Sequence, residues 1–260
     1  MNDQITEQQV TNKFIEQTKT AIKDDSLNQR LGGVHGEYIK GNDKKGILIM
    51  GLNPAGDENT VITESRNSVY LNYIKDISLP GFTNYTYFKP IYDFANKLTN
   101  SNAKWDWCNT SEDKIKETIS NDDKLKGHEK AILDFYNKEK CKHYTIYCGE
   151  MFYIHMTNQN ELLTHINFDP AYIKNMLNLH LDDLKDKGVE IKVIYINNAY
   201  LSHKIEEALG KKDETIIEYK HNDTTNKIAL GSMLSGQRAM DIYSRQRLIK
   251  DITCTGIFSE

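Results

Sequence analysis

Apolar residues recur along the chain with two periods, one typical of buried strands and one typical of helices. Short apolar or β-branched runs predict strands at 46–52, 189–199 and 214–219, and one long strand or two short ones at 143–156. Apolar residues spaced three or four apart predict helices at 4–23, 85–98, 170–188, 201–210 and 237–252. Gly188 and Gly210 close two of these stretches, which is typical of a helix C-terminus.

Strands that alternate with helices favour an α/β fold with a mostly parallel sheet and right-handed crossovers. The sequence has no internal repeat and no clear linker, so we expect one domain over residues 1–260. The helix at 4–23 gives it an N-terminal helical extension over residues 1–30. The polar stretch 99–140 is rich in Lys and Asp and is expected to form a helical insertion. In such folds, ligands bind where loops leave the carboxyl ends of the strands.

Composition narrows the class of protein and its location. Hydrophobic residues make up 38% of the chain, yet no run approaches the ~20 apolar residues that span a membrane. The N-terminus lacks the basic and apolar regions of a secretory signal, and the four Cys are scattered. We therefore expect a cytoplasmic protein with reduced thiols. The eight His lack metal-ligand spacing, and no nucleotide-cofactor motif occurs, so we expect no metal and no cofactor.

The charge balance bears on nucleic-acid binding. The formal net charge is −4, whereas proteins that bind duplexes usually gain affinity from a basic field. A role on DNA must then rest on a local basic patch. Such a stretch occurs in and just before the predicted last helix, where Arg238, Arg245, Arg247 and Lys250 accompany Asp241. A charged run of this kind is also typical of a solvated helix face.

The stretch "GILIMGLNPAGDEN" (46–59) ends a predicted strand on Asn53, directly in front of Pro54. One interpretation is a turn residue whose side chain bonds its own backbone. The other is a functional amide. An Asn cannot act as a general base near neutral pH, but its amide can orient a water molecule. A place after a strand and before a proline restricts the backbone, and positioning is a large part of much catalysis.

The segment "GLNPAG" (51–56) resembles the first motif, G-x-N-P-G, of the uracil-DNA glycosylase superfamily. The match is to the asparagine branch, which holds the mismatch-specific and the single-strand-selective enzymes. "SMLSGQR" (232–238) is similar to the second motif, H/N-P-S-G followed by a wedge residue, although Ser232 or Met233 replaces the family His or Asn. "YFKPIY" (87–92) and "YIHM" (153–156) are similar to intermediate segments. The resemblance covers residues 45 to 252 in order.

The resemblance implies a three-layer α/β sandwich with a central, mostly parallel four-stranded sheet flanked by helices. It implies a monofunctional hydrolase that cleaves the N-glycosidic bond of uracil or a related base in DNA, as in base-excision DNA repair, without a cofactor. In this family the enzyme extrudes the target nucleotide into a pocket and reads its edge. Asn53 would position the attacking water.

The resemblance also implies two groups of binding residues. Base-binding candidates, including aromatic residues that could stack on a flipped base, are Gly51, Leu52, Tyr70, Phe82, His155, Met156 and Asn158. The loop expected to enter the duplex and hold phosphates contains Ser232, Leu234, Ser235, Gly236, Gln237 and Arg238. Two registers stay open for the base-reading strand. Either Met156 lines the pocket, or Asn158 reads the base and Met156 belongs to the core.

A competing hypothesis keeps the fold and drops the chemistry. The chain would then be a catalytically silent module that binds nucleic acid, a nucleotide, or a protein partner or inhibitor, because fold does not determine function. Three features favour it: the acidic balance, the departure at the start of the second motif, and Met156 where the single-strand-selective branch has a base-reading Asn. Under either hypothesis we expect no membrane contact.

Overall fold

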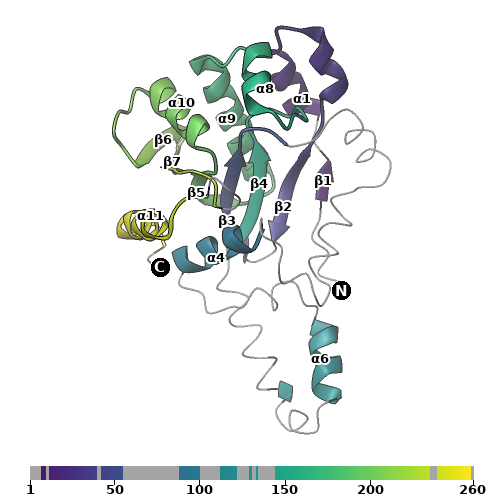
Figure 1. The fold of residues 1–260 in the computed structure, drawn as a ribbon. Helices are drawn as coiled ribbons and strands as arrows, with labels where there is room; N and C mark the ends of the chain where they lie inside the picture. The colour runs from purple at the N-terminus through teal and green to yellow at the C-terminus, as the bar shows by residue number, and fades with distance from the viewer. Residues whose placement is uncertain are drawn as a thin grey trace.

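The computed structural model describes residues 7–9, 12–39, 42–54, 88–99, 112–121, 129–130, 133, 144–234 and 239–258. Its centre is a mixed, seven-stranded sheet (Figure 1). The strands are β1 (Glu7–Gln9), β2 (Val34–Ile39), β3 (Asn42–Gly51), β4 (Tyr144–Glu150), β5 (Glu190–Ile196), β6 (Ile216–His221) and β7 (Thr224–Leu230). Their order across the sheet is β1-β2-β4-β3-β5-β7-β6.

The four middle strands run parallel to one another. β3 pairs with β4 on one side and with β5 on the other, and β5 pairs with β7. β2 and β1 extend the sheet with antiparallel pairing beyond β4, and β6 does so beyond β7. The α/β prediction is therefore confirmed, but four strands was too small a number. The strands β1 (EQQ) and β2 (VHGEYI) lack the continuous apolar run that marks a buried strand.

Helices cover both faces of the sheet, because alternate side chains of each parallel strand point to opposite faces. Leu48 and Met50 of β3 join a core with one set of helices, and Ile47 and Ile49 join a core with another. The first set is α1 (Asn12–Lys19), α8 (Gln159–His165), α9 (Pro170–Asp186) and α10 (Ala199–Leu209). The second is α4 (Phe88–Leu98) and α11 (Ile242–Cys254). Figure 1 shows the first set along the upper side of the sheet.

Local signals set the ends of the long helices. Asp169 caps α9 by accepting a hydrogen bond from the Tyr172 N–H at 2.8 Å, and Pro170 occupies the first helical position. Gly210 ends α10 with φ at 65°, a left-handed conformation that glycine adopts without a steric penalty. These two helices lie where the apolar spacing predicts them.

The N-terminal prediction is wrong in part. Among the described residues of this stretch, 7–9 form β1 on the sheet margin, Asn12–Lys19 form α1, and a 3₁₀-helix follows at Asp25–Arg30. Within α1, which lies inside the predicted range 4–23, Phe14 and Thr18 are buried. Apolar spacing could not reveal that the residues before them pair with β2. In the predicted insertion, α6 (Glu112–Ser120) is helical and lies away from the sheet (Figure 1).

A buried polar network joins β2, α1 and α9 on the first helix-covered face. His35 of β2 is fully buried, and its Nε2 lies 2.8 Å from the Asp183 carboxylate of α9. Lys13 of α1 contacts the same carboxylate at 2.7 Å, and Lys187 binds it from the end of α9. Burial lowers the pKa of His35, so the ring is a neutral donor to Asp183. The Tyr153 hydroxyl, 3.1 Å from His35 Nδ1, continues the chain toward β4.

Candidate functional site

The loops that leave β3, β4, β5 and β7 meet at one end of the sheet, here called the carboxyl edge (residues 51–54, 151–158, 197–198 and 231–234). The β3–β4 pairing continues past the strands, since the Phe152 N–H donates to Leu52 O at 2.8 Å and the Met156 N–H to Pro54 O at 3.1 Å. The Asn197 side-chain oxygen accepts from the Leu234 N–H at 2.9 Å. Segments distant in sequence are thus bonded together around the Asn53 motif.

Asn53 is held by its side-chain amide. The Nδ2 group donates to three backbone carbonyls, those of Pro54 (2.9 Å), Ile154 (3.1 Å) and Met156 (2.7 Å). Because all three neighbours are acceptors, only this orientation of the amide satisfies them. The Oδ1 atom is buried and has no hydrogen-bond partner among the residues that the structure describes. One of these three bonds is local, to the carbonyl of the following residue Pro54, and the other two cross to the segment after β4.

Glu150, which ends β4, is a second unusual group at the carboxyl edge. In the described part of the chain its Oε2 atom is buried without a hydrogen-bond partner, and burial raises the pKa of the carboxyl to about 8. Glu150 pairs with Gly51 in the sheet, and a Cβ atom on Gly51 would lie 2.2 Å from Oε2. The motif glycine therefore makes room for this carboxyl. Sequence reasoning missed Glu150, although an acid within the apolar run "TIYCGEMFYI" (145–154) was an available signal.

The backbone of Glu150 is fixed from the opposite face of the sheet. Its N–H donates to the Tyr153 hydroxyl at 3.4 Å, and its carbonyl accepts from His180 Nε2 at 3.1 Å. Burial lowers the pKa of His180 to about 3, so the ring is neutral. Tyr153 belongs to the network of His35 and Asp183. That network thus positions the peptide whose side chain lies at the carboxyl edge.

The other predicted base-binding residues that the structure describes are buried or cap a helix. Leu52, His155 and Met156 are buried, with Leu52 and Met156 in the core on the first helix-covered face. Asn158 is exposed and caps α8, where its Oδ1 accepts from the N–H groups of Asn160 (3.1 Å) and Glu161 (3.3 Å). Met156 therefore lies as the second register expects, while the Asn158 oxygen is engaged in the cap. Tyr70 and Phe82 lie outside the described residues.

The loop predicted to contact DNA is described only at its start. Leu234 is 1% exposed and packs with α4 and α11, so its side chain is part of the core. Ser232 is half-buried, and its carbonyl accepts from the Tyr195 hydroxyl. Arg245 of the predicted basic stretch donates to Leu234 O at 2.7 Å and so holds this loop against α11. Ser235, Gly236, Gln237 and Arg238 lie outside the described residues.

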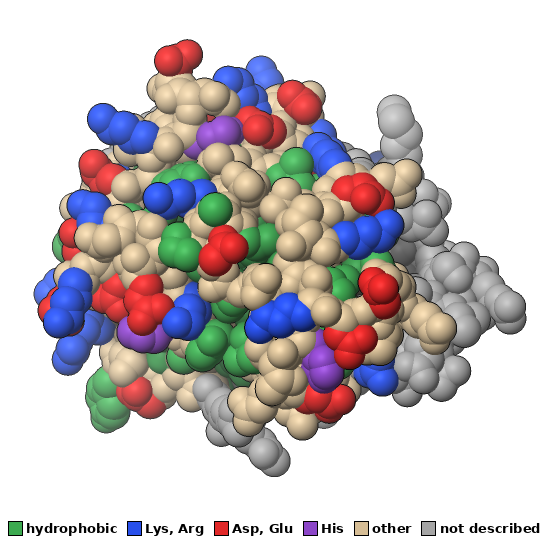
Figure 2. Space-filling view, turned by 90° about the horizontal axis from the view of Figure 1, so that it is seen from above, with side chains coloured by type: hydrophobic (Ala, Val, Ile, Leu, Met, Phe, Trp, Pro, Cys, Tyr) green, Lys and Arg blue, Asp and Glu red, His purple; other side chains and the backbone are tan. Residues whose placement is uncertain are grey.

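Charges on the face covered by α1, α8, α9 and α10 are mixed. Figure 2 shows Lys and Arg interspersed with Asp and Glu over this face, with no large area of one sign. Several of the opposite charges pair with one another, such as Lys204 with Glu207 at 2.6 Å on α10. This face has no basic field of the kind that attracts a duplex.

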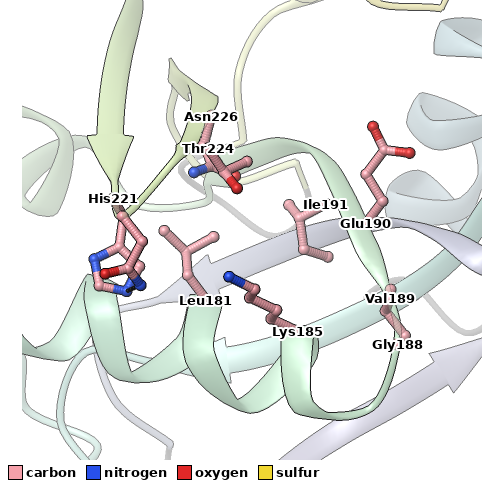
Figure 3. A pocket seen from close by; sticks show the side chains of 10 residues that line it. Leu181, Lys185, Gly188, Val189, Glu190, Ile191, His221, Thr224 and Asn226 are labelled. Atoms are coloured by element: carbon pink, nitrogen blue, oxygen red, sulfur yellow. Dashed lines mark hydrogen bonds between the residues drawn. The ribbon is translucent and has the colours of Figure 1, made fainter.

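A cavity of about 300 Å³ opens at the opposite end of the sheet (Figure 3). It lies between the end of α9, the start of β5 and the β6–β7 hairpin. Leu181, Lys185 and Ile191 occupy its middle, with His221 at one end and Glu190 at the other. Because Glu190 begins β5, this cavity is separate from the carboxyl edge. The described part of the chain has no group of three or more His, Cys, Asp or Glu placed to hold a metal ion.

The comparisons with protein families and with curated proteins found no relative of this chain. No protein-family model matches the chain, and no curated protein is significantly similar to it. None of the helices described here is long and apolar enough to cross a membrane.

The raised pKa of Glu150 predicts a specific pH dependence of stability. Between about pH 4.5 and 8 the folded protein keeps the proton and the unfolded chain loses it, so the folded state loses stability as the pH rises. The free energy of unfolding of the wild type should fall relative to Glu150→Gln by about 1 kcal/mol per pH unit from pH 5 to 8. Urea unfolding at several pH values measures this difference. Glu161→Gln, an exposed acid on α8, should show no such trend.

The position of Met156 predicts the result of a register test. Met156 is 4% exposed in the core, so Met156→Asn would bury an amide among apolar side chains. We expect a loss of about 2–3 kcal/mol in the free energy of unfolding, because a buried amide without partners is costly. Thermal and urea unfolding check it. A variant as stable as the wild type would place residue 156 at a polar pocket wall.

Proposed function

We propose that this protein is a monofunctional N-glycosidic hydrolase that removes uracil or a related modified base from DNA. The observation that carries the proposal is the state of Asn53. Three carbonyls hold its Nδ2 group, and its Oδ1 is a buried acceptor at the carboxyl edge to which no described residue donates. Buried polar groups are nearly always paired, so an unpaired acceptor in a fixed orientation favours a ligand or water that completes it.

The Asn53 Oδ1 acceptor has a direct role in the proposed hydrolysis. A glycosylase takes the target nucleotide out of the stack, and its N-glycosidic bond breaks as positive charge develops on the sugar. Asn53 Oδ1 would accept a hydrogen bond from the water that attacks the sugar carbon. Since the amide is already fixed by three bonds, it needs no reorganisation when the substrate binds. The role is therefore one of positioning, which suits a side chain that cannot remove a proton.

The architecture supports the same proposal. The family resemblance implies a parallel four-stranded centre between two helix layers, and the parallel strands β4, β3, β5 and β7 lie between such layers. In open α/β sheets the ligand crevice lies outside the carboxyl ends of the strands, where Asn53 is found. The antiparallel strands β1, β2 and β6 enlarge the sheet at its margins without interrupting this centre.

The test is base excision by the full chain. Oligonucleotides with one uracil, as single strands, as U·A duplexes and as U·G mismatches, are incubated with the protein and then treated with alkali. We expect strand breaks at the uracil in at least one of these substrates and none in matched oligonucleotides with thymine. If a molar excess of the protein leaves every uracil substrate intact, the proposed activity on uracil is rejected.

A second candidate function is a silent binding module of the same fold. It is favoured by the placement of Met156 and Leu234 in the core, since neither side chain is available to read a base or enter a duplex. Binding without cleavage would identify it. If DNA is the ligand, two to four neutralised phosphates give a log–log salt slope of about −2 to −4. The absence of DNA binding at a low salt concentration of about 50 mM would favour a nucleotide or protein ligand.

A further inference from the structure

The Glu150 side chain has a buried carboxyl oxygen that is unusual for a residue with only a structural role. It places a carboxyl Oε2 in the protein interior with no hydrogen bond and no cation bound to it among the described residues. Buried acids are normally paired, because an unpaired one costs free energy in either protonation state. Such unpaired acids occur where a protein needs a neutral carboxylic acid at physiological pH.

The position of Glu150 connects it to Asn53. Glu150 pairs across the sheet with Gly51, which stands two residues before Asn53. The carbonyls of Ile154 and Met156, which hold the Asn53 amide, follow Glu150 in the loop after β4. The carboxyl edge therefore carries two buried oxygen atoms that lack a partner among the described residues, the amide Oδ1 of Asn53 and the carboxyl Oε2 of Glu150.

We infer that Glu150 is the proton donor of the proposed reaction, giving its proton to the leaving base. This inference rests on the proposed function. As the N-glycosidic bond breaks, its electron pair moves to the base, and the Glu150 O–H proton is transferred to that base. The water held by Asn53 forms the new bond to the sugar carbon and passes its proton to the Glu150 carboxylate. The base leaves neutral, and the acid is regenerated.

Other described acids near the carboxyl edge are engaged or exposed. Asp169 caps α9 and Asp241 caps α11, each through hydrogen bonds to backbone N–H groups. Glu161 is exposed on α8. Burial raises the pKa of the Glu150 carboxyl to about 8, so Glu150 keeps its proton near pH 7.

Several titratable and charged groups surround Glu150, and a pH effect of residue 150 must be distinguished from theirs. Cys148 lies on the same face of β4, Tyr195 of β5 packs on that face, and burial raises the pKa of both. Tyr153 and His180 contact the Glu150 peptide from the other face. Described charged residues on the helices packed against this side include Asp93 and Lys97 of α4 and Arg245, Arg247, Lys250 and Asp251 of α11. An activity change near pH 8 that depends on residue 150 is then assigned to Glu150.

The experiment compares excision by the wild type, Glu150→Gln and the control Glu161→Gln, under single-turnover conditions from pH 6 to 9. Wild-type activity should fall as the pH rises through about 8. Glu150→Gln, which is isosteric but cannot give up a proton, should lose about 100-fold or more at pH 7, within the range of general acid catalysis. Its residual activity should not fall near pH 8. Glu161→Gln should match the wild type.

Chemical rescue separates proton donation from a structural role. In Glu150→Ala, which opens space beside Gly51, added formate should restore part of the excision rate, more at pH 6 than at pH 8. Formate should not affect Glu161→Gln. An active wild type with an equally active Glu150→Gln of unchanged pH profile overturns the role of Glu150 alone. So does a Glu150→Ala variant that is folded, impaired and not rescued. A wild type inactive on every uracil substrate overturns the proposed function, and this inference with it.

Discussion

Asn53→Ala should lower the rate of uracil excision by at least ~100-fold, the minimum expected when an oriented water is lost. The variant removes the Oδ1 acceptor that would hold the water, and no other described side chain offers an unpaired amide oxygen in the same place. Single-turnover excision at saturating enzyme measures the chemical step without a contribution from product release. A folded Asn53→Ala protein with wild-type turnover would remove Asn53 from the mechanism.

The same substitution should also reduce stability. Alanine leaves the carbonyls of Ile154 and Met156 without the donor that Asn53 supplies. Leaving such groups unsatisfied costs about 1–3 kcal/mol, more than an ordinary exposed turn residue would. Asn160→Ala is the matched control, since Asn160 is an exposed asparagine on α8 near the same edge. It should keep both turnover and stability. Excision is then compared at a temperature where Asn53→Ala remains folded.

Asp183→Ala should lower the free energy of unfolding by about 2–3 kcal/mol, because a buried donor that loses a charged acceptor is costly. Asp183 is 5% exposed and binds His35, Lys13 and Lys187 at once. Although burial acts to raise its pKa, the hydrogen bonds from His35, Lys13 and Lys187 lower it well below the usual range. Removing the carboxylate leaves the His35 N–H buried without an acceptor, and it loosens α1 and α9 from β2.

Asp182, the residue before Asp183, provides the control for the Asp183→Ala variant. Asp182 precedes Asp183 on α9 and bonds His221 at 2.7 Å, but its side chain is 47% exposed. Asp182→Ala should therefore cost less than about 1 kcal/mol, as exposed ion pairs do. Urea unfolding of the two variants under one set of conditions gives the comparison. Equal losses would mean that the network around His35 does not hold these elements together.

Local sequence was enough to determine the helices that carry their own end signals. Pro170 and Gly188 bound α9, and Gly210 ends α10, because proline and glycine restrict or permit particular backbone angles wherever they occur. The run 46–52 was predicted as a strand for a similar reason, since its apolar side chains require burial on both faces. Asn53 was identified by its short motif and its place after that strand.

Only the tertiary structure determined the pairing of strands, and the burial of side chains, that depend on segments distant in the sequence. β1 and β2 carry no continuous apolar run, and their pairing depends on β4, more than a hundred residues later. His35 and Asp183 are 148 positions apart and form one buried pair.

The burial of Glu150 at the candidate site likewise could not be predicted from local sequence. In the sequence it is one of 37 acidic residues, and nothing local sets its charge state. Its Oε2 atom comes to lie beside Gly51 of β3 only when the two strands align, and there it is buried with no partner among the described residues. Covalent neighbours determine backbone preferences, but burial and hydrogen-bond partners depend on which segments the fold brings together. The sequence therefore identified Asn53, and only the fold placed Glu150 beside its motif.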